Sequence, residues 1–513
     1  MGIVSLATVL SRVLGLGRDV LTFAIFGTSA LHSAFQFAFT LPNLFRRLLG
    51  EGALTAAMIP VLSEEVEEKG KEGSWDLVNQ VMCWLCLLAM VLVGLAWILF
   101  SLLPLWSGLD QRWYDGAALA RILFPYLIFI CLAAMLASAL NVLHRFAIPA
   151  LSAVWLNLSI LIFLGLGSWF IVETPEQRMH FLCAGVLVGG FLQFLIPALA
   201  LRREGWRPAW NFRKTTRLRE IAWLMIPGLA GTAIFQINVV VSRSLAFSLD
   251  SGAVSILYLA NRLVELPLGV FAIAVSTVIF PLLSRDAARQ DTAAMQRSFV
   301  LGLRMNLLLT LPAAAGLAVL HEPILIALFQ WGSFGPEQVA LTGPVVAVFA
   351  LSIPGYAWAT YTTRGFYALK NTRTPVKIAG LAFLLNVALS LFFMRILGVM
   401  GLALANVLST TIQAMILQWR LSLAHPAMNP APVLADFIKT LLATLAMAFL
   451  VSFGWHSWVD VWGSGKGSAV MALPLGIGAG AAVFTCLIWM LNVHGRTELQ
   501  EFLRKKLFSS SRS

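Results

Sequence analysis

The residues best suited to chemistry are six arginines that interrupt otherwise apolar segments: Arg12, Arg18, Arg46, Arg47, Arg243 and Arg262. A charged side chain at the centre of a bilayer costs at least about 2.5–3.5 kcal/mol, so these residues are expected to face a wet cavity. The planar guanidinium group of arginine matches two phosphate oxygens at once, whereas the ammonium group of lysine does not. Arginine at all six positions therefore favours recognition of a phosphate-bearing anion.

Acidic residues near these arginines offset only part of their charge. Glu51 and Glu265 lie four and three residues after an arginine, so each can meet that arginine on one helix face. Asp19 is adjacent to Arg18 and is expected to point elsewhere, because neighbours on a helix lie about 100° apart. Counting the six arginines against the three carboxylates predicts a cavity about three charges positive at neutral pH.

Simpler roles exist for several of these arginines. Arg46 or Arg47 could lie near a helix end with its charged tip at the membrane surface. Arg262 and Glu265 could form a structural ion pair between helices. Arg243 has no evident partner in the sequence and could also be interfacial.

Catalytic and metal-binding patterns are missing from the sequence. All five cysteines lie in apolar runs, and the CxxC spacing of Cys83 and Cys86 has no second pair or nearby histidine to complete a zinc site. The seven histidines form no HExxH motif, and no GxSxG or Walker motif occurs. We therefore predict no catalytic residue, metal or cofactor, and a transporter driven by the membrane potential or by monovalent cation or proton coupling.

The composition indicates that these arginines are positioned by membrane helices. Hydrophobic residues make up 59% and charged residues 12% of the chain, and runs such as 81–100 and 378–397 have the length of about 20 residues that spans a bilayer. We predict an all-α polytopic membrane protein with about fourteen spans. The predicted spans centre near Leu16, Ala53, Val91, Cys131, Ile160, Gly189, Ala233, Val270, Leu309, Ala350, Val387, Ser409, Ala446 and Gly480.

In a membrane protein, the formal net charge of +12 is first of all information about which loops face the cytoplasm, and only then about ligands. If the N-terminus is inside, nearly all basic loop residues fall on the inner side, which predicts cytoplasmic termini and an even number of spans. The positive-inside rule explains these residues without nucleic-acid binding. Residues 1–27 lack a small-residue cleavage site after a short apolar core, so we expect no cleaved signal peptide.

Three pairs of segments repeat at offsets near 225 residues: 18–27 with 243–252, 125–149 with 354–375, and 59–65 with 280–286. An even number of spans in each repeat predicts two lobes of parallel orientation with a cavity between them. The predicted organisation is an N-lobe of six helices at 1–203, a basic cytoplasmic linker at 204–220, a C-lobe of six helices at 221–422, two further helices at 423–495 and a basic cytoplasmic tail at 496–513.

Several motifs together resemble the MurJ (MviN) family. They are SRVLGLGRD at 11–19, FTLPNLFRRLLGEGA at 39–53, HRFAIPA at 144–150, ANRLVELPLGV at 260–270, LFQWGSF at 328–334 and KNTRTPVKIA at 370–379. The family comprises lipid II flippases of bacterial cell-wall synthesis, within the multidrug/oligosaccharidyl-lipid/polysaccharide exporter superfamily. The resemblance covers about residues 11–418, and the last two helices match in position and hydrophobicity alone.

The resemblance implies fourteen helices and a lipid-tail groove formed by the last two. It also implies that a set of residues lines the cavity and is needed for function. The implied arginines are Arg12, Arg18, Arg46, Arg47 and Arg262, and Ser11, Asn43, Glu51 and Glu265 match further motif positions. Some members have an acidic residue at Ser33, a lysine at Thr40 and an acidic residue at Asn261, so the charge of the cavity and any ion coupling there cannot be carried over.

The implied function is to flip lipid II from the cytoplasmic to the outer leaflet of the bacterial inner membrane by alternating access. The chain would act as a monomer with transient contacts to the cell-wall synthesis machinery. A flippase for another polyprenyl-pyrophosphate-linked oligosaccharide would need the same positively charged cavity. An ion-coupled multidrug exporter would prefer an acidic or aromatic cavity. A membrane scaffold would need no charges in a cavity, and an integral acyltransferase would need a catalytic His or Ser constellation, so neither fits the sequence well.

Overall fold

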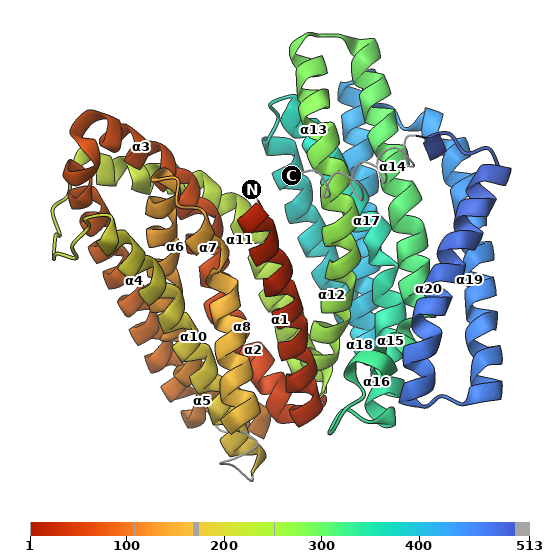
Figure 1. Cartoon of the computed structure of the whole chain (residues 1–513), viewed down its shortest axis with the longest axis horizontal. Helices are drawn as coiled ribbons and strands as arrows, with labels where there is room; N and C mark the ends of the chain where they lie inside the picture. Colours follow the sequence, from red (N-terminus) through yellow and green to blue (C-terminus); the bar gives the residue numbers. More distant parts are fainter. Residues whose placement is uncertain (1, 107, 168–173, 251, 498–513) are drawn as a thin grey trace. The chain divides into compact units, whose positions relative to one another are not determined.

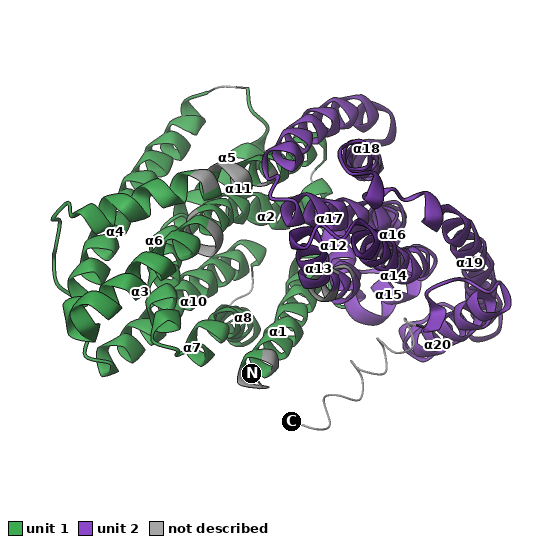
Figure 2. Ribbon diagram, turned by 90° about the horizontal axis from the view of Figure 1, so that it is seen from above, with its two compact units in different colours: residues 1–255, 331–334 green, residues 256–330, 335–513 purple. Residues whose placement is uncertain are grey.

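The computed structural model describes residues 2–106, 108–167, 174–250 and 252–497. Within these ranges the chain consists of helices and their connections, with no β-strand, as Figure 1 shows. The prediction of an all-α protein is confirmed. Figure 2 distinguishes two compact units: unit 1 holds the described residues up to Ser255 together with Trp331–Phe334, and unit 2 holds the others.

Unit 1 is built mainly from the helices before residue 250. They are α1 (Gly2–Phe26), α2 (Ala30–Phe45), the π-helical η1 (Arg46–Ala53), α3 (Leu54–Gly73), α4 (Trp75–Leu102), η2 (Leu103–Leu105), α5 (Gln111–Leu123), α6 (Tyr126–Val142), α7 (Ala147–Ala150), α8 (Ser152–Ile162), η3 (Phe163–Gly167), α10 (Pro175–Arg203) and α11 (Thr216–Leu249). Polar N-caps begin several of them: Ser29, Asp110, Thr174 and Thr215 each accept a backbone N–H of the first turn.

Unit 2 contains the remaining helices. They are α12 (Ala253–Pro267), whose first three residues belong to unit 1, η4 (Leu268–Ala272), α13 (Ile273–Ala288), α14 (Thr292–Val319), α15 (His321–Phe329), α16 (Pro336–Ala350), α17 (Ser352–Ala368), α18 (Arg373–Ala424), η5 (Pro426–Met428), η6 (Ala431–Val433), α19 (Leu434–Trp462) and α20 (Lys466–Met490). The predicted end of the N-lobe at residue 203 and start of the C-lobe at residue 221 remain predictions. They were drawn by counting helices along the sequence, whereas the two units are defined by contacts within each of them.

Within the described ranges, fewer helices than the predicted fourteen spans are long and apolar enough to meet a criterion of length and hydropathy. Among the described residues, nine helices meet it, or ten if the bent pair Gln111–Leu123 and Tyr126–Val142 is one span. All fourteen predicted centres lie in helical segments, yet a count of fourteen is not confirmed. One reason is α18, whose 52 residues contain a break at Gly398 with φ 57° and ψ −132° and would be about 78 Å long if straight.

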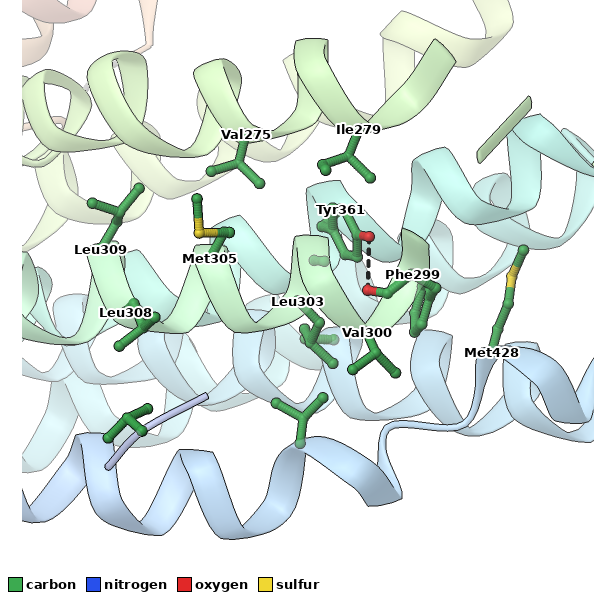
Figure 3. Close-up of a cluster of buried hydrophobic side chains, with 14 of the residues drawn as sticks. Val275, Ile279, Phe299, Val300, Leu303, Met305, Leu308, Leu309, Tyr361 and Met428 are labelled. Atoms are coloured by element: carbon green, nitrogen blue, oxygen red, sulfur yellow. Dashed lines mark hydrogen bonds between the residues drawn. The ribbon is translucent and has the colours of Figure 1, made fainter. Parts of the chain in front are cut away.

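Each unit has its own hydrophobic core. In unit 2, buried side chains of α13, α14 and α17 pack together, including Val275, Leu303 and Tyr361, as shown in Figure 3. The Tyr361 hydroxyl donates a hydrogen bond of 2.9 Å to the carbonyl oxygen of Phe299, which satisfies the one polar atom of this large buried ring. In unit 1, the corresponding cluster includes Met58 and Leu136. Phe45 at the end of α2 and Met225 of α11 pack against the unit 1 cluster, which therefore supports the segments that carry Arg46 and Arg243.

The two C-terminal helices are attached to α14 by an ion pair in unit 2. Arg304 Nε on α14 donates to Asp436 Oδ2 at 2.7 Å, and the backbone N–H of His494 donates to Asp436 Oδ1 at 3.1 Å. Asp436 is only 3% exposed and lies in the first turn of α19, where a negative charge is favoured by the helix dipole.

We expect Asp436→Ala to lower the stability of the purified protein by about 2 kcal/mol, because it leaves the partly buried Arg304 without its carboxylate. The thermal midpoint in detergent measures this loss. Asp460→Ala, at an exposed position of the same helix, is the matched control and should leave the midpoint unchanged. Equal midpoints for the two variants would contradict the prediction.

Candidate functional site

Arg18 on α1 is the most tightly held of the predicted arginines. Its Nη1 donates to Asn157 Oδ1 at 3.1 Å, and Asn157 Nδ2 donates to the carbonyl oxygen of Ser11 at 3.1 Å. Asn157 lies on α8, so these bonds fix α1 against α8 within unit 1. The side chain of Arg18 is 17% exposed, which leaves its guanidinium group partly accessible.

The expectation that Asp19 points away from Arg18 is wrong. Arg18 Nε and Nη2 both donate to Asp19 Oδ1, at 3.1 and 2.6 Å, and the Asp19 side chain is 3% exposed. Adjacent Cα–Cβ bonds do point in different directions on a helix, but the long arginine side chain folds back far enough to reach its neighbour. This buried carboxylate compensates part of the Arg18 charge and restricts its rotamers.

The second arginine cluster lies where α2 passes into η1. Pro42 has no N–H to continue the regular hydrogen-bond ladder, and η1 follows as a π-helix over Arg46–Ala53, a form often found at functional sites. Arg46 Nε donates to Asn43 Oδ1 at 3.0 Å, which joins two predicted residues. Arg47 is half-buried, whereas the side chain of Glu51 lies outside the part of the chain that the structure describes.

Arg243 on α11 has partners on α2. Its Nη1 donates to Thr40 Oγ1 and, at 3.5 Å, to the carbonyl oxygen of Gln36. Gln36 Nε2 is 3.1 Å from His32 Nε2, and His32 Nδ1 is 2.7 Å from the carbonyl oxygen of Gly27. Arg243 is therefore joined to a buried polar row on α2 and does not extend unpartnered to the membrane surface.

In unit 2, the predicted pair on α12 does meet. Arg262 Nη1 is 3.4 Å from Glu265 Oε2, with side-chain exposures of 31% and 45%. Asn261 Nδ2 donates to Glu265 Oε1 at 3.0 Å. The carboxylate thus holds both neighbours on one exposed helix face, where a solvent-screened ion pair contributes little to stability.

Sequence reasoning missed several polar partners. His32 and Gln36 precede Thr40 at intervals of four residues, and this i, i+4 spacing on an apolar helix was an available signal. No local signal could have linked Asn157 to Arg18, because 139 residues separate them. Arg364 on α17 also interrupts an apolar segment, and it lies 5.5 Å from the centre of the Phe280 ring.

Arg12 is exposed, and within the described ranges it has no hydrogen-bond or ion-pair partner. Among the residues searched in those ranges, no group of three or more His, Cys, Asp and Glu side chains could hold a metal ion. The donor groups of the site are guanidinium and amide N–H groups, which bind anions such as phosphates. The arrangement in each unit can therefore bind and orient an anion.

The LFQWGSF motif supports the end of α1. Ser333 donates from its backbone N–H to the carbonyl oxygen of Ala24 at 2.7 Å and from Oγ to that of Ile25 at 2.9 Å. The Phe334 ring is fully buried and lies 5.6 Å from the Phe23 ring. Gly332 has φ +51°, and a Cβ atom there would be 2.3 Å from the carbonyl oxygen of Ala24. Only glycine fits this turn without displacing α1.

We expect Gly332→Ala to destabilise the protein by about 1–2 kcal/mol, since alanine disfavours positive φ and meets backbone rather than a flexible side chain. Gly335→Ala is the matched control, because its nearest contact is a side-chain oxygen at 3.4 Å and its φ is −89°. The thermal midpoints of the two variants provide the comparison. A Gly332 variant as stable as the control would show that the turn adapts.

Comparison with known proteins gives consistent results. A family model described as "Lipid II flippase MurJ" matches residues 23–473. A protein of Vibrio cholerae named "Probable lipid II flippase MurJ" is 32% identical over 96% of this chain and 95% of its own. One from Rhizobium meliloti with the same name is 33% identical over 88% of this chain and 85% of its own.

The structure is also similar to solved structures. "Lipid II flippase MurJ, inward closed conformation" superposes with a TM-score of 0.78 at 26% identity, covering 96% of this chain and 100% of that one. An inward-facing multidrug resistance MATE transporter gives a TM-score of 0.66 at 13% identity, with coverages of 82% and 94%. The second likeness concerns the fold alone.

Proposed function

Because this multi-pass membrane protein belongs to the MurJ family of lipid II flippases, we propose that it moves lipid II from the cytoplasmic to the outer leaflet of the bacterial inner membrane. The observation that carries the proposal is the family match over residues 23–473. No bond of the substrate is made or broken in this transport, so the protein acts as a transporter rather than an enzyme.

In the proposed mechanism, the cavity arginines bind the pyrophosphate of lipid II. Arg18 supports this role because Asp19 and Asn157 hold its guanidinium group in one orientation, and a preorganised fork loses less entropy when it binds an anion. Arg46 is oriented in the same way by Asn43. Arg12, Arg47, Arg243 and Arg262 with Ser11, Glu51 and Glu265 complete the proposed set of substrate-binding residues.

Transport is proposed to follow alternating access, in which the head group is exposed first to the cytoplasm and then to the outside. Both termini lie in the cytoplasm. Moving two negative charges outward across an inside-negative membrane of 100 mV releases up to about 4.6 kcal/mol, at about 2.3 kcal/mol per charge. The membrane potential can therefore drive the substrate outward, and coupling to a proton or monovalent cation would add to this driving force.

The undecaprenyl tail is proposed to stay in lipid beside α19 and α20. These helices expose large apolar side chains, among them Phe449, Phe453 and Leu475, as a lipid-facing surface requires. The protein is proposed to work as a monomer, with transient contacts to the enzymes that supply and use the substrate.

The proposal is tested by expressing the chain in a bacterium depleted of its own lipid II flippase. An externally added enzyme that cleaves lipid II measures how much of it reaches the outer leaflet. We expect the chain to restore growth and cleavage. Good membrane expression without cleavage would refute lipid II transport and favour another polyprenyl-pyrophosphate oligosaccharide, or a drug, as the cargo.

A further inference from the structure

The connector between α10 and α11, residues 204–215, forms a non-helical strap fixed to the side of α4 in unit 1. Asn79 on α4 holds its first part: Nδ2 donates to the carbonyl oxygen of Arg207 at 3.1 Å, and Oδ1 accepts the indole N–H of Trp206 at 2.9 Å. Trp206 is 2% exposed. The strap therefore begins as an ordered part of the unit.

The second part of the strap is held by Gln80, which follows Asn79 directly, and by Cys83, one turn further along α4. The backbone N–H of Asn211 donates to Cys83 Sγ at 3.3 Å, and Thr215 Oγ1 donates to Gln80 Oε1 at 2.6 Å. Cys83 is eight residues into the span Trp75–Leu105, which is about 12 Å along the helix axis. A span of 31 residues is about as long as a bilayer with its headgroups is thick, and on that basis the strap is expected to reach the boundary between headgroups and acyl chains.

The strap presents two exposed aromatic rings at this depth. Trp210 is 81% and Phe212 47% exposed, and their rings stack with centroids 6.1 Å apart. Phe212 also packs edge-on against Trp84 of α4, at 5.9 Å. Below this level α4 exposes Leu88 and Leu95 as expected for a lipid-facing helix. Tryptophan on such a surface is typical of the membrane interface.

Three cations flank these rings. Arg207, Arg213 and Lys214 are all exposed, and Lys214 Nζ lies 5.2 Å from the centre of the Trp84 ring. Basic residues beside interfacial aromatic rings attract the anionic headgroups of the cytoplasmic leaflet. The combination matches an anionic phospholipid in both of its parts, the phosphate and the upper acyl chain.

The acidic residue of the strap does not neutralise these cations, because it is already paired. Glu204 Oε2 accepts from Lys71 Nζ at 2.5 Å, and Glu204 Oε1 accepts from Arg145 Nε at 2.9 Å. The hydrogen bond from Lys71, followed by its charge and by Arg145, holds the pKa of the Glu204 carboxyl below its usual value. Glu204 is thus an ionised anchor for α3 and the α6–α7 turn.

We propose that the strap is a binding site for anionic phospholipids, in which Trp210 and Phe212 insert at the acyl boundary and Arg207, Arg213 and Lys214 contact the headgroup phosphates. This site shares no residue with the proposed lipid II site, and phospholipid binding to it can be measured without transport. An acidic protein or a nucleic acid could also bind the three cations. Neither would contact the aromatic rings, which lie level with the apolar face of α4.

The test is native mass spectrometry of the purified full chain with dioctanoyl phosphatidylglycerol and dioctanoyl phosphatidylcholine. The parent should prefer phosphatidylglycerol. The triple variant Arg207→Gln, Arg213→Gln and Lys214→Gln should lower that preference at least about tenfold, since each cation near a lipid surface adds several-fold. The control triple variant Arg285→Gln, Arg289→Gln and Arg297→Gln removes three exposed arginines of unit 2 and should keep the preference.

A further variant, Trp210→Ala with Phe212→Ala, should weaken binding of both lipids while its charge is unchanged. Trp210 is largely exposed and Phe212 about half exposed, so the thermal midpoint should stay close to the parent value. An unchanged midpoint would show that the variant is folded. The proposal is overturned if the strap charge variant retains the parent's preference or if the control loses as much. Equally tight binding of heparin, independent of the aromatic pair, would assign the strap to an acidic macromolecule and also overturn it.

Discussion

Replacing Arg18 with alanine is expected to lower the amount of lipid II that reaches the outer leaflet by about 100-fold. A charge-assisted hydrogen bond contributes up to about 3 kcal/mol, and about 1.4 kcal/mol corresponds to a factor of ten. The change also removes the ion pair between Arg18 and the buried Asp19, so more of the local negative charge would act on the pyrophosphate. Cleavage of lipid II by an external enzyme, at matched membrane abundance, measures the loss.

Two companion variants separate binding from structure. Arg203→Ala, at an exposed position in the last turn of α10, should transport normally. Asn157→Ala should reduce transport about tenfold through loss of the bond that positions Arg18, and adding it to Arg18→Ala should cost no more than Arg18→Ala alone. Full transport by the Arg18 variant would show that this arginine is structural.

The sequence was sufficient to predict the helices and to single out the arginines within apolar segments, because both depend on local composition. Long apolar runs must be helical in a membrane, and a charge within such a run is conspicuous whatever the fold. The same local reasoning predicted the contact between Arg262 and Glu265, which are three residues apart. These features do not require knowledge of how distant segments pack.

The remaining features depend on side-chain conformation and on distant contacts. The pairing of Arg18 with Asp19 follows from how a long side chain folds back, which a helical wheel does not represent. The bond from Arg243 to Thr40 spans 203 residues. By contrast, the break at Gly398 lies between the predicted span centres at Val387 and Ser409, so here the apolar runs did indicate that one long helix divides.

Replacing Arg262 with alanine is expected to lower lipid II exposure about 30-fold, the effect of losing about 2 kcal/mol of phosphate binding. Its ion pair with Glu265 is 3.4 Å long, and both side chains are partly exposed, so screening limits the pair's contribution to folding. The thermal midpoint should therefore change little while transport falls. A structural ion pair would produce the opposite result.

Exchanging the two charges provides the sharper test of the same site. Arg262→Glu with Glu265→Arg keeps an i, i+3 pair on α12 and so preserves any structural bridge, but it moves the cation by almost one helical turn. Transport needs the guanidinium group at a fixed place relative to the pyrophosphate, because a bidentate bond tolerates little displacement. We expect the exchanged protein to be as stable as the parent and to transport no better than Arg262→Ala. Glu265→Gln leaves the arginine in place and keeps an amide oxygen for Asn261, so it should lower transport less than Arg262→Ala does. Recovery of transport in the exchanged protein would mean that the pair acts as a bridge and that the phosphate is bound elsewhere.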